Sequence, residues 1–292
     1  MLFIIIIFLL GLAIGSFINA LEYRITEKKT MAGRSFCPHC KHQLAWYDLF
    51  PLLSFAFLGG KCRYCKKKIS WQYPLIELVT GLTFSAVLFF SPFAVFLNLN
   101  QQIGNPTNVL RLLMPTNSYF SFMNWVSILI TLIIFSILIL VALHDAKTGY
   151  ILSIYVFVAA FLALVLIFLG YQGGLDATMI TSYFFPFIWS AIVPASILFS
   201  LYFFSKGKWM GAGDSELAVL MGLFLGFPLI LVSFYTAFIV GSIWSLILVY
   251  VAKKAKMKSA VPLGPFLVLG VYVAYFLGPL LVDFYVKMFL GA

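Results

Sequence analysis

Two aspartates are the residues whose surroundings most suggest chemistry. Asp214 follows two glycines in the segment Gly211-Ala212-Gly213-Asp214, and a new apolar run opens at Leu217. Asp145 stands just beyond another apolar run, Ser121 to Leu143. Burying a lone carboxylate in lipid costs several kcal/mol, so each side chain is expected to face water, a partner or a substrate. We therefore expect both aspartates at the ends of membrane helices, with Gly211 and Gly213 letting another backbone approach Asp214.

The pattern leaves three interpretations of this pair open. A carboxylate near a helix N-terminus is often a cap or a partner of the helix dipole, which suits Asp214. Asp145 follows its expected helix, where the dipole disfavours an anion, so capping does not explain it. Paired carboxylates also serve proton- or cation-coupled membrane transporters. The third interpretation is aspartyl catalysis, in which two neighbouring carboxylates share one proton.

Other catalytic layouts find little support in the sequence. It contains no HExxH zinc-protease motif, no GxSxG elbow and no phosphate-binding P-loop. Two of its three histidines lie in a cysteine-rich loop, and the third, His144, adjoins Asp145. Adjacent residues on a helix do not face each other, so His144 and Asp145 are not expected to form the His-Asp part of a Ser-His-Asp triad.

Four cysteines form a second candidate site. Their spacing is C-x2-C-x21-C-x2-C, built from Cys37, Cys40, Cys62 and Cys65. Four thiolates satisfy tetrahedral zinc, and two such pairs at this separation are typical of zinc sites. The polar segment around them is too short for a good core, so a metal would stabilise it. We expect structural Zn²⁺, because a closed four-cysteine site leaves no open position for catalysis.

Redox chemistry is the rival interpretation of these cysteines. Cys37-Pro38-His39-Cys40 resembles a thiol-oxidoreductase motif, but that motif expects a βαβ surround that this sequence does not predict. Attachment of a c-type haem needs His directly after the second Cys, and position 41 is Lys. His39 and His42 are expected to be loop residues.

Composition places the chain in a membrane. It is 63% hydrophobic and only 10% charged, its mean hydropathy is +1.06, and apolar runs long enough to span a bilayer recur. A net charge of +10 would suggest nucleic acid in a soluble protein. Here the basic residues gather in a few loops, as the positive-inside rule predicts. We therefore expect the lipid bilayer as a partner and no nucleic acid.

The order of apolar and basic segments predicts an all-α polytopic membrane protein with about eight transmembrane helices. With both termini outside, seventeen of the nineteen Lys and Arg lie on the inside. Gly11 and Gly15 in the first helix have the GxxxG spacing of helix packing. The expected spans are 1–21, 74–98, 121–143, 150–170, 182–204, 215–227, 229–252 and 261–290.

Three domains follow from this topology: a first helix at 1–21, a cytosolic zinc domain at 22–73 and a helical membrane domain at 74–292. The cytosolic placement rests on ten of the nineteen basic residues, which fall between residues 22 and 73. Glu22 and Glu77 flank that segment, and the sequence does not decide between a helix-end role and a functional one.

Several blocks of the chain resemble the type IV prepilin peptidases, the bacterial leader peptidases of type IV pilins, type II secretion pseudopilins and competence pseudopilins. Gly211-Ala212-Gly213-Asp214 matches the GxGD motif of that family, and Asp145, with Ile151 six residues on, matches its first catalytic aspartate. The N-terminal blocks that match are Gly15-Ser16-Phe17-Ile18-Asn19, the two cysteine pairs around Trp46–Ser54, Gly60–Cys65 and Tyr73–Glu77.

The resemblance implies an aspartic endopeptidase of the bacterial cytoplasmic membrane. Such an enzyme would cleave the basic leader of prepilin or pseudopilin substrates after a Gly at the cytosolic face, with Asp145 and Asp214 as its catalytic pair. It also implies N-methylation of the new N-terminus with S-adenosylmethionine, with residues 22–73 as a zinc-binding methyltransferase domain and residues 74–292 as the peptidase domain. Residues 22–73 show no donor-binding fingerprint. The alternative is a proton- or cation-coupled transporter with a structural zinc domain.

Two positions depart from the family pattern. Leu152 stands where the family usually has Pro, seven residues after the first aspartate, and Glu216 stands where it often has Lys. Neither change removes a carboxylate. Both alter the backbone or the charge beside the expected site.

Overall fold

The computed structural model describes residues 2–30, 33–90, 122–170, 184–251 and 261–289. The chain divides into two compact units, Met1–Ser91 and Pro92–Ala292. Within the described ranges every regular element is helical, and extended pairing is confined to two isolated bridges. The predicted all-α class is therefore confirmed for these ranges. The end of the expected span 74–98, the stretches between expected spans at 99–120 and 171–181, and the basic residues from 253 to 258 lie outside them.

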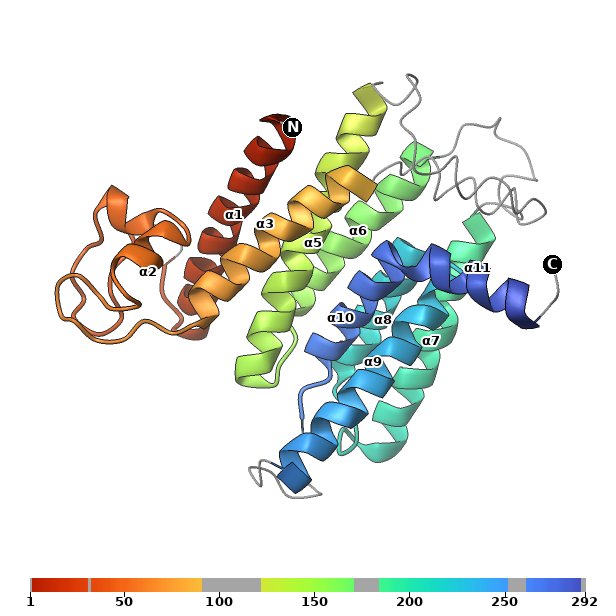
Figure 1. Ribbon diagram of the computed structural model, residues 1–292. Coiled ribbons are helices and arrows are strands. Elements are labelled where there is room, and N and C mark those ends of the chain that lie inside the picture. Colours follow the sequence, from red (N-terminus) through yellow and green to blue (C-terminus); the bar gives the residue numbers. More distant parts are fainter. Residues whose placement is uncertain (1, 31–32, 91–121, 171–183, 252–260, 290–292) are drawn as a thin grey trace. The chain divides into compact units, whose positions relative to one another are not determined.

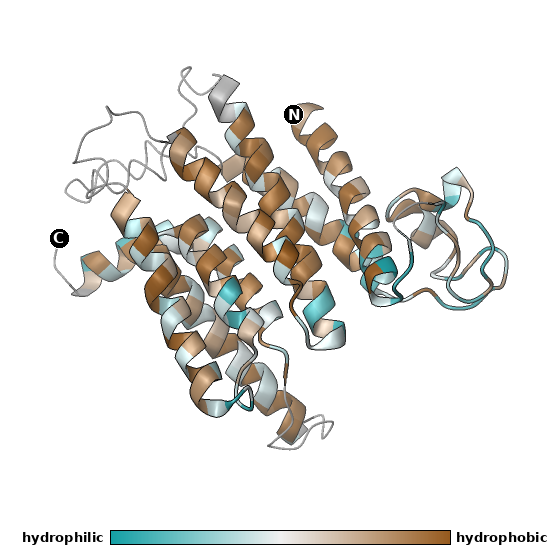
Figure 2. Ribbon diagram, turned by 180° about the vertical axis from the view of Figure 1, so that it is seen from behind, coloured by the Kyte–Doolittle hydropathy of each residue, from teal (hydrophilic) through white to brown (hydrophobic). Residues whose placement is uncertain are grey.

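The first unit is a pair of helices with a folded connection between them. Helix α1 (Leu2–Thr26) and helix α3 (Gln72–Phe90) lie side by side, and the connection holds a 3₁₀ turn (Trp46–Leu49) and the short α2 (Leu53–Phe57) (Figure 1). Apolar colour runs along the two helices, whereas hydrophilic colour gathers at the end of α1 and along the connection (Figure 2). This unit therefore combines two membrane-type helices with one polar loop region.

The predicted role of the GxxxG glycines in helix packing is confirmed. A Cβ on Gly11 would lie 2.8 Å from the Gly81 Cα, and one on Gly15 would lie 2.7 Å from the Glu77 Cα. Both distances are below any ordinary carbon contact. The absence of side chains thus lets the backbones of α1 and α3 approach closely, as small residues do in membrane helix pairs.

Replacing Gly15 by Val is expected to destabilise the α1–α3 pair by about 1–3 kcal/mol, because the added side chain overpacks against the backbone of α3. Thermal unfolding of the detergent-solubilised protein would measure the loss. Ala13→Val is the matched control, since Ala13 is exposed on the same helix. Equal melting temperatures for the two variants would contradict this packing.

The second unit is a helical bundle around α8. Its helices are α5 (Phe122–Thr148), α6 (Ser153–Gly170), α7 (Phe185–Ser205), α8 (Ala212–Leu225), α9 (Leu229–Leu246, followed by a π turn, Ile247–Val251), α10 (Gly264–Phe276) and α11 (Gly278–Phe289). Helix α8 packs against α6, α7, α9 and α10, and ten of its fourteen residues are buried. Since a helix apolar all round belongs in an interior, α8 is the centre of this unit.

An aromatic cluster joins α5, α8 and α10. The ring of Phe135 on α5 lies 5.6 Å from Phe224 on α8 and 5.1 Å from Tyr275 on α10, measured between centroids. Phe224 and Tyr275 stack on each other at 5.5 Å. Edge-to-face and stacked pairs of this kind are favourable beyond the area they bury. The three helices are therefore held together at one level by a shared contact.

Five helices in the described ranges are long and apolar enough to cross a membrane, and a bent pair would make six. Helix α8, with 14 residues, and the apolar part of α6, Ser153–Leu169, are shorter than these five helices. The long helices differ in how much of their apolar stretch is buried within the protein: 61% for α5, but only 22% for α7 and for α9. We conclude that the chain is a multi-pass membrane protein with α7 and α9 toward lipid, and the count of eight spans stays a prediction.

The expected last span over 261–290 consists of two helices, and it stays a prediction that the pair crosses the membrane as one span. Helix α10 ends at Phe276 and α11 begins at Gly278, and the two axes are bent by 70°. Pro279 follows the break. Because proline has no N–H and its ring clashes with the preceding turn, α10 cannot run on through this position.

Candidate functional site

Asp214 lies in the first turn of α8. Gly211 is the residue before that helix, with φ −78° and ψ 152°, and its N–H donates to Asp214 Oδ2 at 3.2 Å. A carboxylate so placed satisfies one of the otherwise unpaired N–H groups at a helix start. The capping interpretation therefore describes a local role of Asp214, but the side chain is also 92% buried, which capping alone does not require.

Asp145 lies inside α5, and the expectation that it follows the helix is wrong. The helix continues to Thr148 and ends at Gly149, whose φ of +67° and N–H bond to the Asp145 carbonyl form a left-handed cap. The carboxylate accepts a buried hydrogen bond from the Gly264 N–H, 2.9 Å from Oδ2. Only 4% of Asp145 is exposed. An anion with few polar neighbours in the last turn of a helix is not explained by helix stability.

The fold brings the two aspartates into one neighbourhood. A Cβ on Gly213 would lie 2.7 Å from the Ile151 Cβ, so the residue before Asp214 touches the residue six positions after Asp145. Gly213 thus has a packing reason to be glycine, and its expected part in substrate approach stays a prediction.

Helix lengths place both carboxylates at the same level. Phe135 precedes Asp145 by ten residues on α5, Phe224 follows Asp214 by ten residues on α8, and the two rings touch. At a rise of about 1.5 Å per residue, each aspartate lies roughly 15 Å from this shared contact. Asp145 lies after Phe135 in the chain, whereas Asp214 lies before Phe224. Because Gly213 contacts Ile151, both carboxylates lie toward the same end of the bundle.

The cysteines form two turns of the same construction. In the first, the Cys37 N–H bonds to the His42 carbonyl and the Lys41 N–H bonds to the Cys37 carbonyl. In the second, Cys62 and Lys66 repeat both bonds, with Lys67 as the carbonyl partner. Lys41 and Lys66 both have positive φ, +57° and +58°. Each Cys-x-x-Cys pair is thus presented by a tight turn that closes on a left-handed lysine.

The four thiols are arranged as a metal would need them. Their sulfur atoms all lie within 4.8 Å of one another, and all four cysteines are free of disulfides. Tetrahedral zinc with Zn–S bonds of about 2.3 Å holds its sulfurs roughly 3.8 Å apart. The donor set therefore fits a thiolate-bound Zn²⁺.

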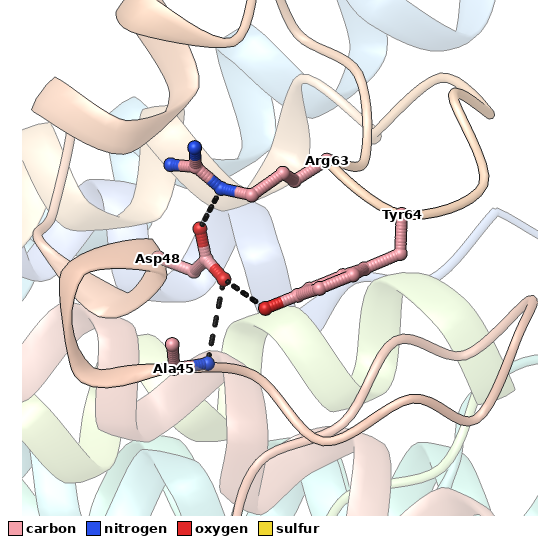
Figure 3. Close-up of polar contacts among 4 residues, drawn as sticks. All are labelled: Ala45, Asp48, Arg63 and Tyr64. Atoms are coloured by element: carbon pink, nitrogen blue, oxygen red, sulfur yellow. Dashed lines mark hydrogen bonds and ion pairs between the residues drawn. The ribbon is translucent and has the colours of Figure 1, made fainter.

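A buried carboxylate ties the 3₁₀ turn to the second cysteine pair. Asp48 accepts hydrogen bonds from Arg63 Nε at 2.8 Å, from the Tyr64 hydroxyl at 3.1 Å and from the Ala45 N–H at 3.3 Å (Figure 3). Burial opposes ionisation, yet these donors hold the pKa of Asp48 below its ordinary value of 3.8. The guanidinium of Arg63 also lies over the Tyr47 ring. This network fixes the orientation of the Cys62–Cys65 turn.

Replacing Asp48 by Asn is expected to speed loss of zinc from the cysteine site several-fold, because three donors lose a charged acceptor worth about 1–3 kcal/mol. The folded pKa is below 3.8, so this contribution is complete above about pH 4 and is lost only in stronger acid. Release to a colorimetric chelator at pH 7 measures it. Glu27→Gln is the control, since that carboxylate forms only an exposed pair with Lys29; equal release rates would contradict the network.

The two glutamates that flank the polar connection have structural contacts. Glu77 on α3 accepts the Leu52 N–H at 2.9 Å, and Leu52 has a positive φ of +60°. Glu22 on α1 is fully buried and accepts a hydrogen bond from the Thr26 hydroxyl at 2.7 Å. The Glu77 contact anchors the turn before α2 to a membrane helix, which gives this residue a helix-to-loop role.

Two site residues have no counterpart in the sequence analysis. Gly264 contacts Asp145 through its backbone N–H, which no side-chain motif reveals. Its position in Pro262-Leu263-Gly264-Pro265 is the only signal, because a glycine between prolines marks a helix start. The role of Asp48 is hidden in the sequence because its partner Arg63 stands fifteen residues away in a loop rich in basic residues.

Two family models match the chain. Residues 9–91 match the "Bacterial Peptidase A24 N-terminal domain", and residues 132–246 match the "Type IV leader peptidase family". The first range contains all four cysteines and the second contains both aspartates. No solved structure matches the chain significantly.

Curated relatives carry one name repeatedly. A "Prepilin leader peptidase/N-methyltransferase" of Bacillus subtilis is 28% identical over 98% of this chain and 99% of its own length. A protein of the same name from Pseudomonas aeruginosa is 25% identical over 94% of this chain and 91% of its length. One from Myxococcus xanthus is 48% identical, over 30% of this chain and 26% of its length. Since both family models match in order and full-length relatives align from end to end, the chain belongs to the type IV leader peptidase family.

Proposed function

We propose that this protein is a membrane aspartic endopeptidase that removes the basic leader of type IV prepilins or pseudopilins and N-methylates the new N-terminus. What supports the proposal is that one unit holds Asp145 and Asp214, two buried carboxylates on different helices, and that Gly213 beside Asp214 packs on Ile151 just after the helix of Asp145. Family membership and the names of the relatives support the same reading. They give no support to the transporter interpretation.

The proposed chemistry needs only the two carboxylates and a water. Two neighbouring carboxyl groups cannot both ionise cheaply, so they share one proton. The ionised group takes a proton from water as the water oxygen attacks the scissile carbonyl carbon, and the protonated group donates to the carbonyl oxygen. The tetrahedral intermediate then collapses: the group that took the proton from water gives it to the departing amine nitrogen, and the other group recovers a proton from a hydroxyl of the intermediate. No covalent bond to the enzyme forms.

Four residues are proposed as ligands of a structural Zn²⁺: Cys37, Cys40, Cys62 and Cys65. The clustering of their sulfur atoms supports this set, and a closed four-thiolate site supplies no catalytic position. The metal would hold together the loop between α1 and α3. Methyl transfer would use S-adenosylmethionine, as the relatives' names suggest, and no described residue is assigned to that donor.

The proposed topology keeps eight spans, with residues 22–73 and the ends of α5 and α8 that carry the aspartates on the cytosolic side. The proposed domains are a first helix at 1–21, a zinc-binding methyltransferase domain at 22–73 and a peptidase domain at 74–292. The distribution of Lys and Arg supports this orientation. The same argument supports the bacterial cytoplasmic membrane as the location, where a prepilin presents its basic leader on the inner face.

Mass spectrometry of a prepilin incubated with the purified protein tests both proposed activities. With S-adenosylmethionine present, we expect loss of the leader and a gain of one methyl group on the mature chain. Without the donor, we expect the cleaved chain alone. Cleavage without methylation would show that the protein is a peptidase only. Failure to cleave every prepilin and pseudopilin tried would overturn the proposal.

A further inference from the structure

The start of α10 makes a contact with Asp145 that the proposed chemistry does not yet use. The Gly264 N–H donates to Asp145 Oδ2 at 2.9 Å, and the bond is buried although the residues are 119 positions apart. Gly264 is the first residue of α10, where backbone N–H groups have no partner within the helix. A charge-assisted bond from such a group to a carboxylate is among the stronger hydrogen bonds in proteins.

The contact leaves no room for a side chain at position 264. A Cβ there would lie 2.5 Å from Asp145 Oδ2, 3.0 Å from its Cγ and 3.3 Å from its Cβ. Pro265, the next residue along the chain, has no N–H to offer. Gly264 both donates to the carboxylate and lets it come this close.

Helix lengths again place the three residues at one level. Tyr275 follows Gly264 by eleven residues on α10, and its ring contacts both Phe135 on α5 and Phe224 on α8. At about 1.5 Å per residue, Gly264 lies roughly 16 Å from this contact, close to the values for Asp145 and Asp214. The aromatic cluster therefore sets the height at which α10 presents its first N–H to Asp145.

We propose that Gly264 is a positioning residue of the peptidase site, whose N–H fixes the orientation of the Asp145 carboxylate relative to Asp214. The inference rests on the proposed function of the two aspartates. A carboxylate held by one oxygen cannot rotate freely about its Cβ–Cγ bond, so the pair keeps the geometry that proton sharing requires. Gly264 acts through Asp145 and need not touch the substrate.

Gly264→Ala tests the proposal through the separation of kcat from KM. The added methyl displaces the carboxylate, and a misplacement of about 1 Å can cost on the order of 100-fold in rate. We expect kcat for prepilin cleavage to fall about 100-fold while KM changes less than about threefold, because the binding of the substrate helix is untouched. Gly241→Ala in α9 is the matched control, since its Cβ would meet Phe266 at an ordinary 3.4 Å.

A thermal double-mutant cycle with Asp145→Ala tests the contact itself. In the wild-type background Gly264→Ala is expected to lower the melting temperature, because the methyl meets the carboxylate. In Asp145→Ala the Oδ2 and Cγ atoms are gone, so the same change is expected to lower it much less. This readout stands even where Gly264→Ala alone is too unstable for kinetics, because the double variant is then expected to fold.

The outcomes separate this inference from the function on which it rests. A wild-type protein that cleaves no prepilin overturns the proposed function, and this inference with it. An active wild type with a Gly264→Ala kcat within threefold of normal overturns the inference alone. An equal loss of melting temperature in both backgrounds shows that the effect does not pass through Asp145, and that also overturns it.

Discussion

Asp214→Asn is expected to lower the rate of prepilin cleavage on the order of 10,000-fold or more, with substrate binding little changed. The amide keeps the size of the carboxylate and can still accept the Gly211 N–H, so the start of α8 is retained. It cannot exchange a proton with water or with the scissile carbonyl, and acid–base groups that act as a unit show losses of this order. Asp145→Asn is expected to give the same loss for the same reason.

The double variant Asp145→Asn, Asp214→Asn is expected to cleave no more slowly than either single variant. The two carboxylates act together, so losing one already removes the acid–base catalysis of the pair. Single-turnover cleavage followed by mass spectrometry measures all three. Asp283→Asn is the matched control, since that carboxylate forms a surface pair with Lys287 on α11. Methylation of a pilin supplied already cleaved is expected to persist in the aspartate variants. More than about 1% of normal cleavage in either single variant would contradict the catalytic pair.

Cys62→Ser is expected to abolish methyl transfer and to leave cleavage of the prepilin within about threefold of normal. Between residues 33 and 71 the only buried apolar residues are Cys37 and Cys62, so this loop has no hydrophobic core. Structural zinc contributes about 10–16 kcal/mol to the folding of small domains of this kind. Loss of one thiolate therefore unfolds the loop, whereas both aspartates belong to the other unit.

Zinc content by atomic absorption, together with the two activities, measures this effect. His39→Ser is the control, because His39 is a potential ligand in the same loop that does not join the cysteine cluster. Zinc bound at one equivalent in Cys62→Ser would contradict the four-cysteine site. Full methylation after complete removal of the metal would contradict the dependence of that activity on the folded loop.

Sequence patterns predicted best where covalent spacing determines geometry. Cys37 and Cys40, like Cys62 and Cys65, are close in the chain, so each pair could be expected to form one turn, and the structure places all four sulfurs together. The GxxxG spacing predicted a close helix contact because four residues make about one turn. The partner of that contact, Gly81, could not be predicted from the spacing alone.

The sequence was less informative about helix ends and distant contacts. Helix α5 runs past Asp145 because nothing before Gly149 interrupts it, and hydropathy marks only where the apolar run stops. The break after Phe276 depends on Gly278 and Pro279. Both stand inside one long apolar run, so hydropathy alone predicts no interruption there. The Gly264 contact with Asp145 spans 119 residues and uses a backbone N–H, so it exists only in the folded chain.

The depth of the two aspartates has a consequence for the supply of water. Hydrolysis consumes one water molecule for every peptide bond cut, and hydrocarbon is a poor source of it. Asp145 lies one turn before the end of α5, and Asp214 lies in the first turn of α8. A water molecule entering from the adjoining aqueous phase therefore needs to pass only the last turn of a helix. Such a protease requires no wetted channel through the bilayer, so its outer helices can stay in contact with lipid along their length.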